Sequence, residues 1–191
     1  MLIEKGNDLK NVWDAVKHEL HRGALDKKHP FRFVVLGTVG ESGPDTRYVV
    51  LRKIDQEFNF YIYTDGRTAK AKSLAENPKL SLLFYHPQKR IQIRVLAEVA
   101  LHQRDNLAEE HWSRVQGEAR KAYQSWLRPG TEILQPEDAF LWSEDESDAA
   151  NFLVLRIVPS SVEVLQLNGL EHLRAKFFQE EGEWRGAWLA P

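Results

Sequence analysis

A close succession of short β-rich segments between residues 31 and 101 most constrains how this chain can fold. The runs of β-branched and aromatic residues cover residues 31–39, 46–54, 58–64, 80–86 and 90–101. The gaps between them leave no room for repeated crossover helices, so neighbouring strands are expected to run antiparallel. Closing such a sheet into a barrel removes its exposed edges. The sequence therefore predicts a mainly β protein with added helices (α+β), built on an antiparallel barrel.

Helical segments are expected before and within this series of strands. Apolar residues recur at helical spacing over residues 9–20, which predicts a packing helix within residues 1–29 that Asn7 or Asp8 caps. Thr68 is expected to cap a short helix that Asn77-Pro78 ends. A helical insertion is expected within residues 105–130, with a break at Gly117.

Strands are expected to resume in the last forty or so residues of the chain. The expected runs are residues 152–158, 162–167, 173–178 and 184–189. The chain has no internal repeat and no low-complexity linker, so residues 1–191 are expected to form a single domain. Its parts would be the N-terminal helix in 1–29, the core strands in 31–102, the insertion in 105–130 and the C-terminal strands in 151–191.

The amino-acid composition limits which kinds of partner this protein is expected to have. With 26 Lys and Arg against 28 Asp and Glu, no chain-wide positive field attracts nucleic acid. No apolar stretch approaches the roughly 20 residues that cross a bilayer, so no membrane association is expected. The absence of cysteine excludes disulfides and thiolate metal sites, and it is compatible with the cytoplasm, the expected location.

Three weaker motifs favour ordinary structure over function. Gly37, Gly40 and Gly43 lack the spacing of a dinucleotide loop and are expected to form a hairpin. His18 and His21 stand three residues apart instead of the four of a zinc helix. The acidic stretch within residues 136–148 (Glu144, Asp145, Glu146 and Asp148) is expected to be a solvated loop. No metal site is predicted.

The informative residues lie in two neighbouring segments. Arg47 and Arg52 stand at the two ends of a strand-like run, and their odd spacing directs them to opposite faces. The segment from Tyr61 to Lys70 then brings a strand end, two cations and a helix start within a few residues. Backbone N–H groups, a capping hydroxyl and cationic side chains at such a point form a natural phosphate site. For Arg47 and Arg52, the alternative is that both are rim arginines that reach solvent.

In order and spacing these residues resemble the pyridoxamine 5'-phosphate oxidase family, through Arg47 to Arg52, Tyr63-Thr64, Lys70, Asn77-Pro78 and Gln92. The resemblance covers about residues 31–191 and is strongest over 47–95. The stretch with Trp126 and Pro129-Gly130 is similar to a subgroup of oxidase-related FMN-binding proteins of unassigned substrate. The resemblance implies a split β-barrel of the six-stranded type and a homodimer with FMN at its interface.

The resemblance also implies which residues contact the cofactor. Arg47 and Lys70 would hold the FMN phosphate, and Gln92 would reach the flavin from the partner subunit. Arg52 stands where a lysine is frequent, and a cation there stabilises charge on a reduced flavin. The full set of expected cofactor contacts is Arg47, Tyr48, Val49, Val50, Leu51, Arg52, Tyr63, Thr64, Arg67, Thr68, Lys70, Gln92 and Lys176.

The residues that differ from the family's pattern lie mostly at the positions where its members hold substrate. Ala69 stands at a common phosphate-binding arginine, for which Arg67 is a nearby substitute, and Leu165 replaces a flavin-contacting tryptophan. Ser113, Gly117 and Lys121 occupy the positions of the substrate-phosphate ligands, so that pocket is expected to be dismantled. His172 and Arg174 resemble, in scrambled order, the family's substrate motif.

These comparisons of residues predict an FMN-dependent oxidoreductase acting on a small, unidentified substrate and distinct from a true pyridoxamine 5'-phosphate oxidase. No catalytic base is assigned. Two alternatives stay open: a flavin-binding or storage protein without turnover, and the same barrel holding haem or a deazaflavin, since a fold alone does not fix its ligand.

Overall fold

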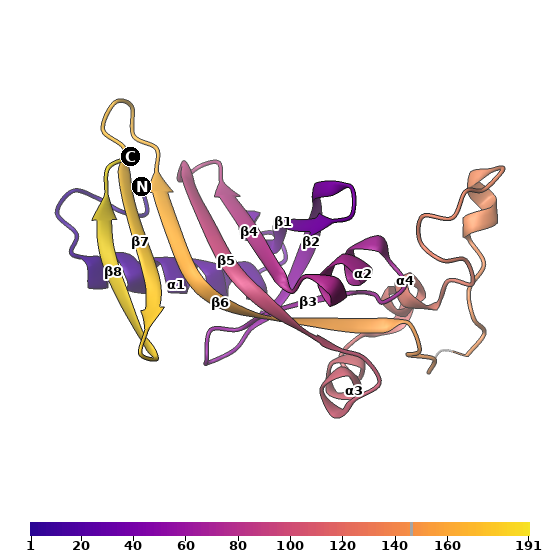
Figure 1. Ribbon diagram of the computed structural model, residues 1–191. Coiled ribbons are helices and arrows are strands. Elements are labelled where there is room, and N and C mark those ends of the chain that lie inside the picture. Colours follow the sequence, from indigo (N-terminus) through magenta and orange to yellow (C-terminus); the bar gives the residue numbers. More distant parts are fainter. Residues whose placement is uncertain (146) are drawn as a thin grey trace.

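An antiparallel β-barrel forms the centre of the molecule in the computed structural model, which describes residues 1–145 and 147–191 (Figure 1). The strands form one sheet in the order β3-β2-β1-β4-β5-β6-β7-β8, and β3 also pairs with β6. The β3–β6 pairing closes the strands from β3 to β6 into a barrel and leaves β7 and β8 as an extension. The expected mainly β split barrel is therefore confirmed.

The bounds of the elements follow the sequence pattern closely in the first half of the chain. The strands are β1 (Phe33–Gly40), β2 (Gly43–Ile54), β3 (Phe60–Asp65), β4 (Lys79–His86), β5 (Ile91–His102), β6 (Phe152–Gln166), β7 (Leu173–Glu180) and β8 (Glu183–Leu189). The helices are α1 (Leu9–Leu25), α2 (Ala69–Glu76), α3 (Asn106–Trp112) and α4 (Lys121–Gln124), with 3-10 turns at Pro30–Arg32, Gly117–Arg120 and Pro136–Ala139.

One expectation about the strands is wrong. Residues 152–158 and 162–167 were expected to form two strands, but they lie in the single strand β6. Pro159 pairs with Ala97 and Ser161 pairs with Leu96, so Ser160 is an extra residue at a register shift. Its hydroxyl donates to the Leu96 carbonyl at 3.1 Å. A bulge thus accommodates the proline, which has no N–H to donate, without ending the strand.

The helical insertion lies between β5 and β6, as expected, but in shorter pieces. Asp105 caps α3 by accepting from the Ala108 N–H at 2.9 Å. The chain then leaves the helix, and the positive φ of Gly117 (55°) marks the break before the next turn. In the acidic loop that follows, Glu146 lies outside the described residues. Together α3, α4 and this loop occupy the end of the barrel opposite β7 and β8 (Figure 1).

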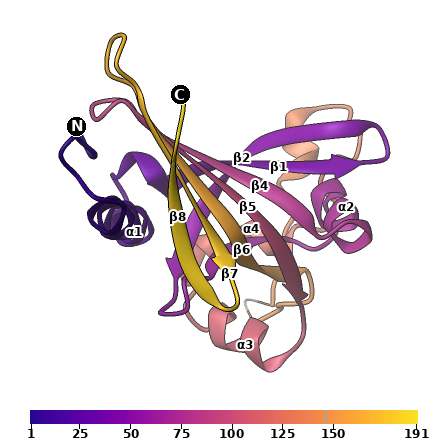
Figure 2. The same cartoon turned by 60° about the vertical axis from the view of Figure 1, so that its left-hand side comes forward.

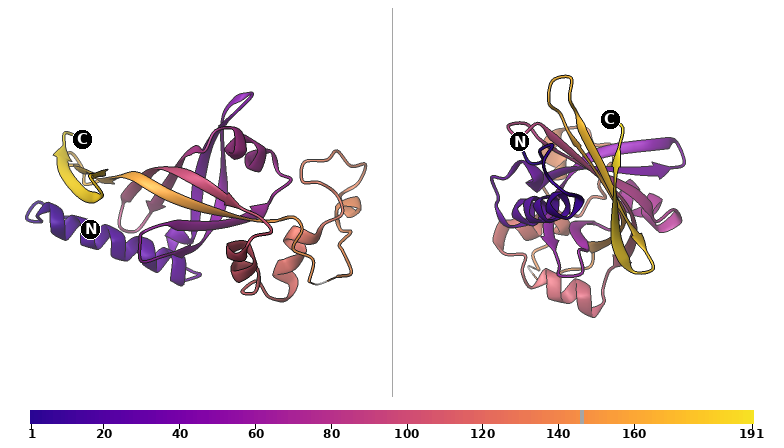
Figure 3. Two further views of the ribbon diagram at one scale, coloured as in Figure 1. Left: turned by 60° about the horizontal axis from the view of Figure 1, so that its bottom comes forward. Right: turned by 90° about the vertical axis from the view of Figure 1, so that its left-hand side faces the viewer.

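Helix α1 covers the other end of the barrel, beside β8 (Figures 2 and 3). Its buried residues Val12, Val16 and Leu20 form one stripe, which matches the predicted amphipathic pattern. At its C-terminal end Gly23 lies so close to Phe31 that a Cβ there would meet the Phe31 Cβ at 2.6 Å. The helix can approach the barrel this closely because it carries no side chain at that point.

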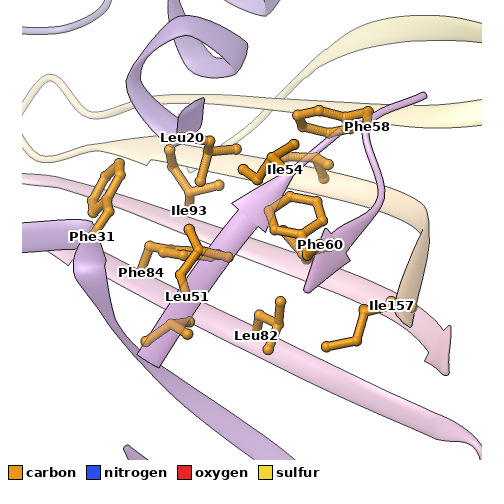
Figure 4. Packing of buried hydrophobic residues seen from close by; sticks show 14 of the residues in the cluster. Leu20, Phe31, Leu51, Ile54, Phe58, Phe60, Leu82, Phe84, Ile93 and Ile157 are labelled. Atoms are coloured by element: carbon orange, nitrogen blue, oxygen red, sulfur yellow. The ribbon is translucent and has the colours of Figure 1, made fainter. Parts of the chain in front are cut away.

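The barrel interior is filled by apolar side chains (Figure 4). Leu51, Phe60, Leu82 and Phe84 are fully buried there. A barrel of this size packs its interior with side chains, so binding sites must lie on its outer surface and at its ends. Among the described residues, no helix has the length and apolar character needed to span a bilayer.

Candidate functional site

The first candidate site is a cationic corner formed by Arg47, Thr68 and Lys70, where β3 ends and α2 begins. The Thr68 hydroxyl caps α2 by accepting from the Ala71 N–H, and it donates to the Asp65 carbonyl at 2.8 Å. The helix start thus places Lys70 in the first turn. Thr64, at the end of β3, is buried.

Arg47 and Lys70 face each other across this corner. The Arg47 guanidinium donates to the Thr38 hydroxyl at 2.7 Å and forms an ion pair with Asp45. Burial lowers the pKa of Lys70, and the nearby Arg47 charge lowers it further. Within residues 1–145 and 147–191, Lys70 has no ion pair with a carboxylate. A half-buried ammonium beside a second cation and without a partner is an arrangement that binds a phosphate well.

Arg67, expected in the same site, is directed elsewhere. Its guanidinium pairs with buried Asp65 at 2.7 Å, and this pairing raises its pKa. The same group donates to the carbonyl of Ser125 at 2.8 Å. Arg67 therefore ties the segment after α4 to the end of β3. Its role as a phosphate ligand stays a prediction, and that role would require this network to open.

The β2 residues between the two arginines alternate between the faces of the sheet. Leu51 is buried in the barrel, so only its backbone is available to a ligand on the outside. Tyr48 is 74% exposed on the outer face. Pairing with β3 shifts between Leu51 and Lys53, so Arg52 is an extra, unpaired residue in the strand. A bulge re-aims side chains, and here the consecutive Arg52 and Lys53 both line one cavity.

This second site, the cationic cavity, has a volume of about 370 Å³. Residues from several separate segments line it: Lys27, Arg32, Arg52, Lys53, Tyr63, Arg114, Val115, Gln116, Ala119 and Tyr123. Among the described residues, no aspartate or glutamate belongs to this lining. The cavity therefore combines positive charge with two phenol rings.

Most of these cations lack a carboxylate partner. Of the cavity's cationic side chains, only Arg114 forms an ion pair in the described part of the chain, with Glu110. Burial lowers the pKa of Arg32, and repulsion from Arg52 adds to the effect. The Nε of Arg52 is buried without a hydrogen-bond partner among the described residues. Such uncompensated positive charge favours an anionic ligand.

The sequence pattern did not reveal this cavity. The expected substrate positions Ser113, Gly117 and Lys121 are absent from its lining. Lys121 instead pairs with Glu118 at 2.9 Å and lies over the Trp142 ring. The positive charge comes from Arg52 and Lys53 on β2, from Arg114 in the insertion, and from Lys27 and Arg32 before β1. The cations outside β2 carry no local motif. Only the fold brings them together.

The remaining predicted residues form a separate group on β5, β6 and β7. Gln92 pairs across the sheet with Tyr85 and Leu165, while Arg174 and Lys176 lie on β7. Arg174 is held by Glu163 at 2.9 Å. The Nδ1 of His172 accepts from the Asn168 N–H at 3.1 Å. In the sheet order, β1 and β4 separate β5 from β2, so one chain does not bring this group to the cationic corner.

Between the two groups lies an outer barrel face with exposed apolar side chains. Its members are Phe33, Tyr48, Leu83, Tyr85 and Leu96, contributed by neighbouring strands from β2 to β5. The register makes the face continuous, because Val35 pairs with Tyr48 on one side and Leu83 on the other. A contiguous apolar patch of this kind is typical of a protein–protein interface.

A cluster outside these sites has the side-chain types of a metal site. Ligand atoms of Glu19, His29 and His86 lie within 4.8 Å of one another. However, the Nδ1 of His29 accepts from the Phe31 N–H, and that of His86 accepts from the Lys89 N–H. Each ring therefore carries its proton on the Nε2 that faces Glu19. The cluster is a hydrogen-bonded network that anchors α1.

Comparisons with known proteins give a consistent result. A family model described as pyridoxamine 5'-phosphate oxidase matches residues 24–166. A pyridoxine/pyridoxamine 5'-phosphate oxidase from Legionella pneumophila is 41% identical over 76 residues, which cover 39% of this chain and 35% of that protein. The chain thus matches about a third of that relative's length. Another from Cupriavidus pinatubonensis is 28% identical, over 83% of this chain and 78% of its own.

Solved structures share the fold. A pyridoxamine 5'-phosphate oxidase-related, FMN-binding protein from Nostoc punctiforme has a TM-score of 0.77 and 25% identity, covering 93% of this chain and 96% of its own. PhzG from Burkholderia lata, solved with tetrahydrophenazine-1-carboxylic acid, has a TM-score of 0.69 and 16% identity, over 96% and 90% of the two chains. At that identity, the similarity to PhzG concerns the fold alone.

Proposed function

Because the chain belongs to the pyridoxamine 5'-phosphate oxidase family, we propose that it binds FMN and acts as an FMN-dependent oxidoreductase on a small anionic substrate. The observation that carries the proposal is Lys70, whose half-buried ammonium lies beside Arg47 without a carboxylate partner among the described residues. A phosphate monoester carries a charge of about −1.5 to −2 and would supply the partner that Lys70 lacks, beside the Arg47 guanidinium that Asp45 already holds. The cationic corner therefore fits the FMN phosphate.

The rest of the cofactor would lie along β2. Bound FMN supplies the hydride-transfer chemistry. The chain contributes the backbone of Val49 to Leu51, and burial of the Leu51 side chain fixes that backbone against the core. Arg52, at the bulge, would stabilise the negative charge that reduction places on the ring.

The cationic cavity is the proposed substrate site. Lys27, Arg32 and Arg52 have no carboxylate partner in the described chain, so a carboxylate or phosphate on the substrate would supply it. By the resemblance, true pyridoxamine 5'-phosphate oxidases hold the substrate phosphate at the positions of Ser113, Gly117 and Lys121, and these residues do not line the cavity. We therefore propose an acidic substrate other than pyridoxamine 5'-phosphate.

A homodimer would complete the site. The cationic corner and the group around Gln92 and Lys176 lie apart in one chain, and the outer barrel face between them is apolar and exposed. Pairing of two copies through this face would cover the apolar side chains. It would also allow Gln92 of one copy to approach the corner of the other.

The cofactor proposal is tested by FMN titration of the apoprotein, followed by flavin fluorescence. Lys70→Ala and Arg47→Ala should each weaken FMN binding by about tenfold or more, because each removes a charge-assisted contact. Lys72→Ala is the matched control: Lys72 lies on the same helix but is exposed and pairs with Glu41. Unchanged affinity in both corner variants would refute the site.

Turnover needs its own measurement. The FMN-loaded protein should be reduced anaerobically by at least one member of a panel of small carboxylates and phosphorylated amines. Bleaching of the flavin absorbance would report this. If the protein binds FMN tightly but no substrate of the panel reduces it, the protein is a flavin-binding protein and the proposed oxidoreductase activity is wrong.

A further inference from the structure

A three-ring arrangement stands behind the wall of the cationic cavity. Tyr61 and Tyr63 are two residues apart on β3, so both project from the outer face of the barrel. His111, from α3, lies flat against the Tyr61 ring at 4.9 Å and edge-on to the Tyr63 ring at 5.5 Å. Its Nδ1 is 2.8 Å from the Tyr63 hydroxyl. His111 is 1% exposed, so this hydrogen bond is closed to water.

Tyr63 connects this arrangement to the cavity. Its ring lines the cavity, and the Arg52 guanidinium lies over it at 5.5 Å. Phe152 packs edge-on against the Tyr63 ring at 5.0 Å. With its hydroxyl bound by His111 and its ring packed by Phe152, Tyr63 forms a fixed surface for Arg52.

The way in which Arg52 is held leaves its charge available. Arg47 is held by Asp45 and Arg174 by Glu163, so a carboxylate already balances each of these cations. Arg52 has no carboxylate partner in residues 1–145 and 147–191. Its guanidinium lies over the Tyr63 ring and interacts with the Tyr123 side chain. A cation–π contact orients a guanidinium without neutralising it. The full charge of Arg52 is thus directed at whatever anion enters the cavity.

The protonation state of His111 suits this role. Burial lowers its pKa to about 4, and the charges of Lys53 and Arg114 contribute. The neutral ring keeps one nitrogen free to accept, so the Tyr63 hydroxyl can donate to Nδ1. A neutral His111 also adds no repulsion to the cluster of cations around Arg52.

We propose that His111 is a positioning residue, which acts through Tyr63 to fix the Arg52 guanidinium at the wall of the cationic cavity for an anionic ligand. This inference rests on the proposed function for the class of ligand, but not on the identity of the substrate. His111 itself does not touch the ligand, and Tyr63 and Arg52 form the only link that the inference requires.

The experiment measures binding of inorganic phosphate to the FMN-loaded protein by calorimetry, with the cofactor filling the cationic corner. Arg52→Ala should weaken phosphate binding by about tenfold. Tyr63→Phe and His111→Leu should each weaken it by about threefold to tenfold, while His111→Asn, whose side-chain amide can occupy the place of Nδ1, should stay within about twofold of the wild type. FMN affinity is measured alongside, so that phosphate binding is compared in proteins with equal FMN occupancy.

A second readout follows Arg52 directly. In ¹⁵N-edited NMR spectra, the Arg52 Nε–H signal, assigned by its loss in Arg52→Ala, should be sharp in the wild type and in His111→Asn. It should broaden through solvent exchange in Tyr63→Phe and His111→Leu. Since Tyr63→Phe retains the ring and its packing, it serves as the test should His111→Leu fold poorly.

The outcomes separate the two proposals. If Arg52→Ala leaves phosphate binding unchanged, the cavity is not the anion site and the proposed substrate class fails. If Arg52→Ala weakens binding but Tyr63→Phe does not, the positioning role is wrong and the substrate class stands. Equal losses in His111→Asn and His111→Leu would also overturn the positioning role, because the loss would then follow the ring and not its hydrogen bond.

Discussion

Glu19, buried on α1, forms a hydrogen-bonded ion pair with Lys89 in the turn between β4 and β5. The Glu19 Oε1 lies 2.6 Å from the Lys89 Nζ. His29 contacts the same oxygen at 2.9 Å. A single carboxylate thus joins α1 to the β4–β5 turn and to the connection that leads into β1. This contact adds to the apolar stripe of α1 in holding the helix in place.

Glu19→Gln should therefore destabilise the protein. Removing one partner of a buried ion pair leaves the other uncompensated, and with Lys89 partly exposed the expected cost is about 3 kcal/mol. Urea unfolding at neutral pH would measure it. Glu76→Gln is the control. Glu76 is exposed and its ion pair with Lys72 is long, at 3.8 Å, so this substitution should change stability by less than about 0.5 kcal/mol. Equal effects in the two variants would contradict the anchoring role.

Acidification should act on the same carboxylate. Burial raises the pKa of Glu19, but Lys89 and His29 outweigh this and bring it below its ordinary value of 4.5. A carboxyl with a lowered folded-state pKa stabilises the protein above its ordinary pKa, and this stabilisation is lost as the pH falls through the folded-state value. The difference in stability between wild type and Glu19→Gln should accordingly shrink below pH 4.5. A difference that persists unchanged at pH 3 would argue against an ionised Glu19.

His111 predicts a separate pH dependence at less acidic values. Its pKa falls from 6.5 to about 4 on folding, so the unfolded chain takes up the proton first. Stability should decline as the pH drops from about 6.5 to 4, with a contribution of about 2 kcal/mol by pH 5. His111→Asn should remove this contribution, whereas His18→Asn, on the exposed face of α1, should retain it. Urea unfolding at pH 7.5 and at pH 5 measures the loss of stability between the two pH values. An equal loss in the wild type, His111→Asn and His18→Asn would refute the burial of a neutral His111.

The outer barrel face predicts the effect of a charge on assembly. Leu83, 37% exposed at the centre of this face, would be buried in the proposed homodimer. Leu83→Glu should convert the dimer to a monomer, as measured by size-exclusion chromatography with light scattering, and should lower FMN occupancy with it. Leu25→Glu, on a more exposed leucine at the end of α1, should leave the mass unchanged. A wild-type protein that is monomeric at all concentrations would remove the dimer from the proposal.

The close approach of Gly23 to Phe31 can be tested by adding one methyl group. Gly23→Ala would place a Cβ 2.6 Å from the Phe31 Cβ, so α1 would have to shift away from the barrel. Overpacking of this kind costs about 1–3 kcal/mol. Gly6→Ala, with no atom within 4 Å of the added Cβ, is the matched control. Thermal unfolding of the two variants should differ clearly, and similar melting temperatures would show that α1 tolerates the shift.

The elements that the sequence predicts well are those with local signals. The strands of the first half are marked by β-rich runs between turns, and α1 by its apolar stripe and Asp8 cap. By contrast, β6 continues through Pro159 because of a bulge against β5, and no local sequence pattern predicts that bulge. The bulge at Arg52 depends in the same way on how β2 meets β3.

The candidate site divides along the same line. Thr68 and Lys70 were predicted because a strand end and a helix start lie close together in the sequence, and Arg47 was predicted through the resemblance to the oxidase family. Lys27 and Arg32 lie in one connection and Arg114 lies in the insertion. None of them carries a motif, so only the tertiary fold makes them neighbours of Arg52. The stacking of His111 on Tyr61 likewise joins an insertion to a core strand.

The mixed origin of the cavity lining bears on how such a protein can change its chemistry. Lys27 and Arg32 come from the connection after α1, and Arg114 to Tyr123 come from the insertion, whereas the cationic corner is built on β2 and α2. Substitutions in the two connecting segments can alter what enters the cavity and leave the corner as it is. Under the proposed function, such substitutions would retune the preferred acid while the frame proposed to hold the cofactor stays the same.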